Sequence, residues 1–409
     1  MEFLKVDSVD DARRKLLSSV KDWMVPSETL APVNACGRIA ANTIYAPQDI
    51  PSFRRSTVDG YAVFAADTAA AGESIPVLLS MKGQVNIGLP ASLSIGRGEC
   101  AEVPTGGMLP DGADAVVMTE YAESFGESGV AMYGSVAVGE NIVQVGEDAR
   151  AGAVLLRRGR RILPQDVGVL AAAGITVLPV YIPPRLTILS TGDELIPPGE
   201  EPNPGQIRDV NTFTLTALAH KSGYSVVGSA VLSDDESALK SALREAMKTS
   251  DIVAVSGGSS KGAKDITRMI IDRISSPGVF THGIAAKPGK PTILAYDSHS
   301  QTLLIGLPGH PVSAMTVFEL LLGWLLREMT GSVQPPAIPA RVTCNIASSP
   351  GKLTCWPAKL EWTGSEYIAE PVFGKSGLIA TLTMADGYFT VDRDKEGLQS
   401  GQTVLVHLF

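Results

Sequence analysis

Three glycine-rich turns in the second half of the chain carry the residue types that bind anions. They span residues 256–262, 287–291 and 306–313. Glycines let a backbone approach a phosphate or an oxoanion closely, the N-terminus of a helix presents unpaired N–H groups, and lysines supply positive charge. The residues of these turns predicted to contact the anions are Gly257, Gly258, Ser259, Lys261, Lys287, Lys290, Pro308, Gly309 and Pro311. Each turn alone has a simpler interpretation as a tight turn or a solvated loop, so the prediction depends on their joint occurrence.

A fourth turn places two carboxylates after a predicted strand. Residues 190–195 read Ser-Thr-Gly-Asp-Glu-Leu, which puts Asp193 and Glu194 at the strand's end. Hard oxygen ligands beside a phosphate site indicate Mg²⁺, which binds one or two carboxylates together with substrate phosphates. Asp265, near the start of the helix after the first glycine-rich turn, is either a helix cap or a metal ligand. A solvated turn remains the alternative for Asp193.

The charge of the chain restricts its partners. Its formal net charge of −9 opposes binding to nucleic acid or to an anionic membrane surface, because either partner would be repelled at long range. Between residues 251 and 291 the balance reverses, with six basic side chains and three acidic ones. A local basic region in an acidic protein suits a small anion.

Length and cysteine content indicate an ordinary globular protein of the cytoplasm. A chain of 409 residues is expected to divide into two to four domains. Its four cysteines show no C-x-x-C spacing, so they indicate neither a zinc site nor a disulfide framework. No apolar run approaches the roughly 20 residues that span a bilayer, and no secretory leader is recognisable.

Alternating strands and helices over residues 179–331 must position the turns. Apolar strands are predicted at 185–190, 224–232, 251–256, 279–286 and 302–307, and helices at 210–221, 236–248, 264–274 and 312–329. This order is typical of an α/β domain with a doubly wound, mainly parallel sheet. Such sheets bind ligands beyond the carboxyl ends of their strands, where the glycine-rich turns are expected to lie.

Three further segments complete the predicted organisation. Residues 1–50 with 149–178 form an elongated helical linker domain, with helices near 8–24, 37–45 and 163–174, the last packing beside the first. Residues 51–148 form a β-rich insert domain, because short extended runs alternate with Gly, Pro and Asp. After a proline-rich linker, residues 332–409 form a small β-barrel or sandwich. Asp59, Thr105 and Asp148 lie in polar turns of the insert, and each turn by itself would indicate no function.

Seven motifs, taken in order, identify a family resemblance. They are Val58–Val63, Pro104–Gly106 with Gly112–Val117, Ser190–Leu195, Gly205–Asn211, Ser256–Gly258, Lys287–Pro291 and Gly306–Gly309. With them the chain resembles, over essentially its whole length, the molybdopterin molybdenumtransferase family, which includes the bacterial and archaeal MoeA proteins and the E-domain of gephyrin.

The resemblance implies a function and a set of site residues. The family inserts molybdate into adenylylated molybdopterin with Mg²⁺ and releases AMP. It forms four-part, elongated homodimers in which the active cleft joins the α/β domain of one subunit to the β-rich domain of the other, so Asp59 and Thr105 would reach across the interface. By position, the family's functional acids fall on Asp59, Asp148, Glu194, Asp234 and Asp265, with Thr105 alongside, and Glu194 and Asp265 are the implied Mg²⁺ ligands. The implied molybdate pocket is lined by Lys287, Lys290, Pro291, Ser313 and Ser376.

Two positions depart from the family pattern. His310 stands where the family usually has asparagine, and Pro357 replaces an expected arginine. Losing that arginine removes a bidentate donor to an oxoanion, which Lys359 replaces only as a point charge. The preference for molybdate over tungstate is therefore left open.

Two alternative functions also remain. The related molybdopterin adenylyltransferase domain shares the α/β fold and the Ser-Gly-Gly turn, but lacks the Asp59 segment and the C-terminal β segment. A non-catalytic scaffold that only binds pterin is the other alternative, and the intact acids Asp59, Glu194 and Asp265 favour an enzyme instead.

Overall fold

The chain divides into two compact units. The computed structural model describes residues 6–126, 129–257 and 261–409, and the side chains of 261–265 lie outside this description. One unit comprises residues 1–29, 158–161 and 179–409, and the other comprises residues 30–157 and 162–178. The first is called the α/β unit below, and the second the β-rich unit.

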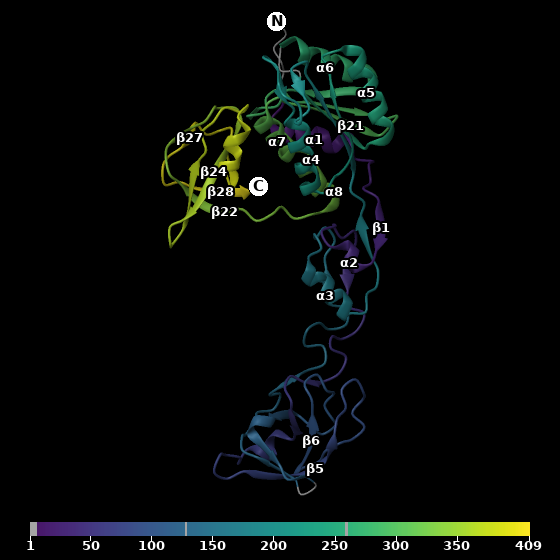
Figure 1. Ribbon diagram of the computed structural model, residues 1–409, viewed down its shortest axis with the longest axis vertical. Helices are drawn as coiled ribbons and strands as arrows, with labels where there is room; N and C mark the ends of the chain where they lie inside the picture. Colours follow the sequence, from purple (N-terminus) through teal and green to yellow (C-terminus); the bar gives the residue numbers. More distant parts are fainter. Residues whose placement is uncertain (1–5, 127–128, 258–260) are drawn as a thin grey trace. The chain divides into compact units, whose positions relative to one another are not determined.

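A six-stranded sheet forms the centre of the α/β unit (Figure 1). Its order is β16 (Ser225–Leu232), β13 (Arg185–Thr191), β17 (Ile252–Gly257), β21 (Thr302–Leu307), β20 (Ile293–Asp297) and β18 (Pro277–His282). Neighbouring strands from β16 to β21 are parallel, and only β20 runs antiparallel to both of its neighbours. The predicted mainly parallel sheet is confirmed.

Helices cover both faces of this sheet. α1 (Val9–Ser19), α4 (Asn211–Ser222), α7 (Pro311–Phe318) and α8 (Trp324–Thr330) pack on one face. α5 (Glu236–Thr249) and α6 (Lys261–Ile274) pack on the other. Alternate residues of one strand enter opposite cores, as Ala254 and Val255 of β17 do. Burial on both faces explains why these strands read as continuous apolar runs.

The structure corrects some predicted helices and strands. The segment predicted as one helix over 312–329 consists of three parts. Helix α7 comes first, a π-helical turn over Glu319–Gly323 follows, and α8 comes last. The strand predicted over 279–286 is β18 followed by the separate short strand β19 (Ala286–Lys287). Strand β20 was not predicted, because its five residues directly follow a proline-rich loop and are too few to show a period. Two short strands after β13, β14 (Leu195–Ile196) and β15 (Ile207–Arg208), pair with each other.

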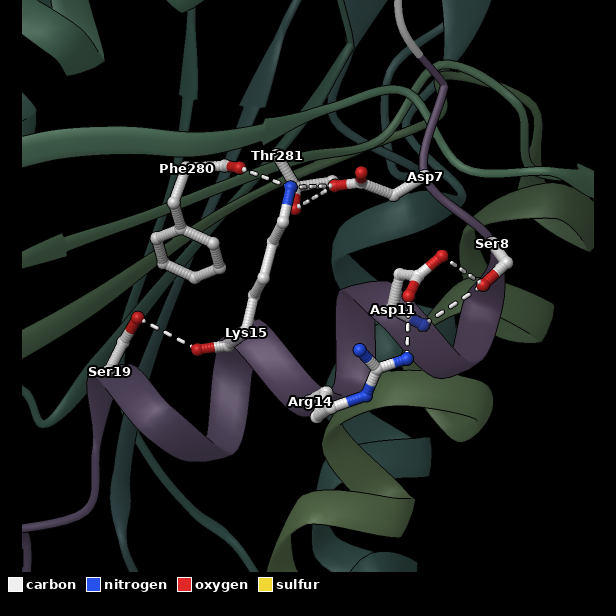
Figure 2. Close-up of polar contacts among 8 residues, drawn as sticks. All are labelled: Asp7, Ser8, Asp11, Arg14, Lys15, Ser19, Phe280 and Thr281. Atoms are coloured by element: carbon white, nitrogen blue, oxygen red, sulfur yellow. Dashed lines mark hydrogen bonds and ion pairs between the residues drawn. The ribbon is translucent and has the colours of Figure 1, made fainter.

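Helix α1 is held against the sheet by polar contacts at its start (Figure 2). The Lys15 ammonium donates to Asp7 Oδ2 at 2.6 Å and to the carbonyl of Phe280 in β18 at 3.2 Å. Thr281 donates to the same Asp7 oxygen at 2.7 Å. The apolar side of α1, including Leu16, is buried in the α/β core. The sequence placed this helix in one domain with the helix over 163–174, whereas the structure assigns α1 to the α/β unit and the helix Pro164–Ala172 to the β-rich unit.

A closed barrel forms the C-terminal part of the same unit. Five strands pair in the order β24 (Leu353–Trp362), β25 (Tyr367–Pro371), β22 (Ile338–Val342), β28 (Thr403–Leu408) and β26 (Gly387–Val391), and β26 pairs back with β24. This confirms the predicted barrel. Strand β24 also pairs with β19, since Ala286 lies opposite Leu353. The barrel thus adjoins the lysine-containing loop that follows β19.

The β-rich unit contains a second six-stranded sheet. Its order is β7 (Ala115–Met118), β4 (Gly60–Val63), β6 (Glu99–Val103), β5 (Val77–Gln84), β9 (Val130–Met132) and β8 (Ala122–Ser124). The unit also contains the α-helices α2 (Pro32–Ala35) and α3 (Pro164–Ala172). Shorter strands pair there as well, β2 (Ile44–Tyr45) with β11 (Val154–Leu156) and β3 (Arg55–Ser56) with β10 (Ile142–Val143).

The predicted helix over 37–45 is wrong. The helix of this segment is α2, which precedes Gly37, and Gly37 has a φ of +83° that ends the helical path. Ile44 and Tyr45 instead form strand β2. In the described part of the chain, none of the helices combines the length and apolar character needed to cross a bilayer.

Candidate functional site

Three of the predicted turns meet at one edge of the α/β sheet. Thr191, the last residue of β13, lies opposite Gly257, the last residue of β17. Ser256 of β17 lies opposite Leu307, the last residue of β21. Parallel strands end at the same edge, so the turns that begin at Gly192, Gly257 and Pro308 are neighbours.

Gly257 occupies a position that only glycine tolerates. Its φ is +141°, and a Cβ there would overlap the carbonyl oxygen and the hydroxyl of Thr191. The close approach of the two strand ends therefore requires a residue without a side chain. Gly258 and Ser259 lie outside the described residues. Helix α6 begins at Lys261, and the predicted roles of the Lys261 and Asp265 side chains also lie outside the description.

Acidic side chains gather beside the first of these turns. The Asp234 N–H donates to Asp193 Oδ1 at 3.0 Å. Partial burial, and then the negative charges of Asp193 and Glu194, raise the pKa of Asp234 above its usual range. The structure thus brings together two predicted acids, Glu194 and Asp234. They come from the turn after β13 and the turn after β16.

A small cavity lies next to Asp234. Its volume is about 30 Å³, and it is lined by Thr191, Ser233, Asp234, Asp235, Leu239, Ile266 and Thr267. Among the side chains that the structure describes, no three His, Cys, Asp or Glu groups are arranged to hold a metal ion. Carboxylate oxygens are nevertheless the donors that Mg²⁺ takes, and mutual repulsion among Asp193, Glu194 and Asp234 is what a cation would relieve. The Mg²⁺ site at Glu194 and Asp265 stays a prediction.

Asn211 joins two of the turns and was not among the predicted site residues. Its Nδ2 donates to Ser256 Oγ and to the carbonyl of Gly309, each at 2.8 Å. These bonds tie the end of β17 to the turn after β21. Two buried acceptors nearby in sequence, Asn211 Oδ1 and Asp209 Oδ2, have no hydrogen-bond partner among the described residues. The available sequence signal was an asparagine at the first residue of a helix, within the Gly205–Asn211 motif.

The loop that contains Lys287 and Lys290 lies at the same edge of the sheet, next to the end of β21. It runs from the end of β18 to the start of β20, and Ile293 of β20 lies opposite Gly306 of β21. Lys287, Lys290 and Pro291 are exposed. Gly289 fixes the loop against α7, because a Cβ there would lie 2.6 Å from Val317 Cγ2. The loop therefore presents two cations on a segment that packs against α7 near its C-terminal end.

The third turn begins helix α7 and contacts the barrel segment. Pro311 is the first residue of α7, and Ser313 is buried within its first turn. The carbonyl of Ser376, from the loop after β25, accepts the Val312 N–H at 3.2 Å. Ser376 Oγ lies 2.8 Å from His310 Nδ1. The structure thus brings Ser313 and Ser376 to one helix N-terminus, as the predicted oxoanion pocket requires.

Lys287 makes a second contact with the C-terminal segment. Its ammonium donates to Ser349 Oγ at 3.2 Å. Pro357, which stands at the expected arginine position, lies on β24 opposite Tyr388. It supplies neither a charge nor an N–H donor.

Asp59 and Thr105 form a compact pair within the β-rich unit. Asp59 precedes β4, Thr105 follows β6, and these strands pair through Gly60 and Val103. Asp59 Oδ1 accepts the backbone N–H of Thr105 at 2.7 Å and its hydroxyl at 3.0 Å. The backbone bond, followed by the side-chain bond, lowers the pKa of Asp59 below its usual range. Asp148 is exposed in the same unit, and its N–H donates to the carbonyl of Ile50.

The Thr105 hydroxyl gives a testable pH effect. In Thr105→Val the pKa of Asp59 should rise towards its ordinary value, because one of two donors to the carboxylate is lost. A lowered folded-state pKa stabilises the fold above the unfolded pKa of about 4, and this contribution is lost as the pH falls through the folded pKa. The variant should therefore show a smaller loss of stability below pH 4. Carboxyl NMR titration measures the shift, and Thr105→Ser is the matched control that keeps the wild-type pKa. An equal pKa in Thr105→Val would show that the hydroxyl bond is not formed.

Three family descriptions match successive parts of the chain. They are the MoeA N-terminal region (domain I and II) at residues 7–174, a probable molybdopterin binding domain at residues 187–328, and the MoeA C-terminal region (domain IV) at residues 339–409. The order of these matches agrees with the order of the motifs.

Relatives and solved structures match over almost the full length. The molybdopterin molybdenumtransferase of Haemophilus influenzae is 30% identical over 408 residues, covering 98% of each chain. That of Bacillus subtilis is 31% identical, covering 98% of this chain and 93% of the relative. The crystal structure of a molybdopterin biosynthesis MoeA protein from Pyrococcus horikoshii superposes with a TM-score of 0.83 at 31% identity, covering 99% of this chain and 100% of the other. The chain belongs to the MoeA family of molybdopterin molybdenumtransferases.

Proposed function

We propose that this protein inserts molybdate into adenylylated molybdopterin and releases AMP. The observation that carries the proposal is the meeting of glycine-rich turns and acidic side chains at one sheet edge. The turns at Gly257 and Pro308 suit the phosphates, and Glu194 with Asp234 lies beside them. The names of the relatives, molybdopterin molybdenumtransferase, support the same reaction.

Different residues of the proposed pocket would bind the two anions. Lys287, Lys290, Ser313 and Ser376 would hold the molybdate dianion, with the lysines neutralising its charge. The backbone N–H groups after β17 would hold the phosphates of the pterin substrate. When bound at Glu194 and Asp265, Mg²⁺ would neutralise the phosphoanhydride and so favour its cleavage. Tungstate has the same charge and shape, and competes for the same groups.

The proposed reaction balances without a further reactant. Water cleaves the phosphoanhydride, so AMP leaves and the pterin keeps its own phosphate. Molybdate then forms two bonds to the dithiolene sulfurs, and one oxo ligand leaves as water with the two thiol protons. The water consumed in the first step equals the water released in the second. The protein's part is to place the two anions side by side and to neutralise their repulsion.

The subunit arrangement is also a proposal. Asp59 and Thr105 belong to the β-rich unit, and we infer that they complete the site of a second subunit in a homodimer. The support is their exposed, preformed pairing in that unit, together with family membership. The mass of the protein in solution, measured by light scattering, tests the dimer.

Release of AMP tests the proposed reaction. Purified protein supplied with adenylylated molybdopterin, Mg²⁺ and molybdate should release AMP, and the product should reconstitute a molybdenum enzyme. Omitting molybdate or Mg²⁺ provides the controls. Failure to release AMP in the complete mixture would disprove the enzyme proposal and leave a pterin-binding scaffold. Formation of adenylylated molybdopterin from molybdopterin and ATP would instead support the adenylyltransferase alternative.

A further inference from the structure

A short loop of the C-terminal segment closes onto the N-terminus of α7 through three contacts. His310 Nδ1 lies 2.8 Å from Ser376 Oγ, and the Val312 N–H donates to the Ser376 carbonyl at 3.2 Å. The ring of His310 also lies against Gly377, where a Cβ would be 3.6 Å from His310 Cδ2. Val312 and His310 flank Pro311 at the helix start, so one side of the predicted oxoanion pocket is held by this loop.

We propose that His310 is a positioning residue that decides whether the Ser376 hydroxyl can donate to the oxoanion. The inference rests on the proposed function, because it takes Ser376 as part of the molybdate pocket. His310 acts through Ser376 and need not touch the substrate itself. Its ring is exposed, so it exchanges protons with solvent.

The hydrogen-bond donors and acceptors of the two side chains explain how His310 would control the Ser376 hydroxyl. A serine hydroxyl has one hydrogen and two acceptor lone pairs, and a neutral histidine has one N–H and one bare nitrogen. When Nδ1 is bare, Ser376 must donate its only hydrogen to His310. Only lone pairs then face the pocket, and they repel an oxoanion. When Nδ1 carries a proton it donates to Ser376 Oγ, and the hydroxyl hydrogen is free to bind the oxoanion.

Protonation of His310 and binding of the oxoanion are therefore coupled. Histidine changes charge between about pH 5 and 8, and the imidazolium always carries a proton on Nδ1. The imidazolium also adds a positive charge near the anion. By linkage, the state that binds the oxoanion better also binds the proton better, so affinity should rise as the pH falls.

Segments that contact helix α7 carry lysines. The same loop carries Lys375, and the loop that contacts α7 through Gly289 carries Lys287 and Lys290. Helix α7 has no acidic residue in its first turn. Helix α4, whose first residue contacts Gly309, carries His220 and Lys221 only in its last turn. Of these groups, His310 is the one that contacts Ser376.

The dependence of molybdate affinity on pH tests the proposal. AMP release is measured at varied molybdate between pH 6 and pH 8, a range in which molybdate stays a dianion. In the wild type the apparent affinity should weaken as the pH rises, because the imidazolium always donates from Nδ1 whereas a neutral ring does so in only one of its two tautomers. His310→Asn should bind with nearly the same affinity at every pH, because an amide N–H is always available to Ser376. Ser376→Ala should bind weakly at every pH.

A control substitution at another histidine and a second measurement complete the test. His299→Asn, which changes an exposed histidine after β20, should keep the wild-type pH dependence. Equal pH dependence in the wild type and His310→Asn would overturn the inference while AMP release still supported the proposed function. If the wild type released no AMP at any pH, the proposed function would fail. Equilibrium dialysis of molybdate alone across the same pH series would then decide the His310 inference independently.

Discussion

Asp59→Asn is expected to lower the rate of AMP release by about 10²-fold or more, with little change in stability. Asparagine keeps the shape of the side chain, and its Oδ1 can still accept both hydrogen bonds from Thr105. What the variant loses is the negative charge, which the lowered pKa of Asp59 maintains throughout the neutral range. Steady-state AMP release and thermal unfolding of the variant measure the two effects. Glu73→Gln, which removes an exposed acid from the same unit, should leave the rate unchanged.

Subunit mixing extends the Asp59 experiment to the proposed dimer. If Asp59 acts on the site of a second subunit, mixing Asp59→Asn with Glu194→Gln subunits should restore part of the activity. One site of the mixed dimer then contains both intact acids, and full statistical exchange would give mixed dimers half of the population. Recovery would be absent if Asp59 and Glu194 act within one chain. Wild-type rates in Asp59→Asn itself would show that this carboxylate is not part of the site.

Gly257→Ala is expected to destabilise the α/β unit by about 2–6 kcal/mol, as the sum of two costs. A positive φ on a residue with a side chain costs about 1–3 kcal/mol. Overlap of the new methyl group with Thr191 adds about 1–3 kcal/mol, because the strand ends must separate. The separation would also disturb the turn that is proposed to bind phosphate, so AMP release should fall as well.

Tryptophan fluorescence can report this effect specifically. All four tryptophans, Trp23, Trp324, Trp356 and Trp362, belong to the α/β unit, so urea unfolding followed by their emission monitors that unit alone. Gly199→Ala is the control, because a Cβ at Gly199 has no neighbour within 4 Å. It should leave the unfolding midpoint nearly unchanged. An unchanged midpoint in Gly257→Ala would contradict the close contact between the ends of β13 and β17.

Sequence reasoning performed best where the signal was local. The turns, the buried parallel strands and the barrel were predicted because each produces its own pattern over a few residues. Sequence reasoning failed for α1, because the spacing of its apolar residues shows that one side is buried but does not show which element covers it. It also missed β20, which has too few residues to show a period, and Asn211, whose importance depends on two partners 45 and 98 positions away.

The sequence by itself determined the family and indicated the chemistry of the proposed site. Glycines, lysines and acids in a fixed order predict anion binding, since each turn is formed by neighbouring residues. Only the tertiary structure decided which turns share an edge, because the sheet places β13 between β16 and β17, and β17 beside β21. It also placed His310 against Ser376, 66 positions further along the chain. Strand order and barrel docking depend on the burial of apolar faces that are far apart in the sequence. The spacing of residues along the chain does not show which of these faces pack together.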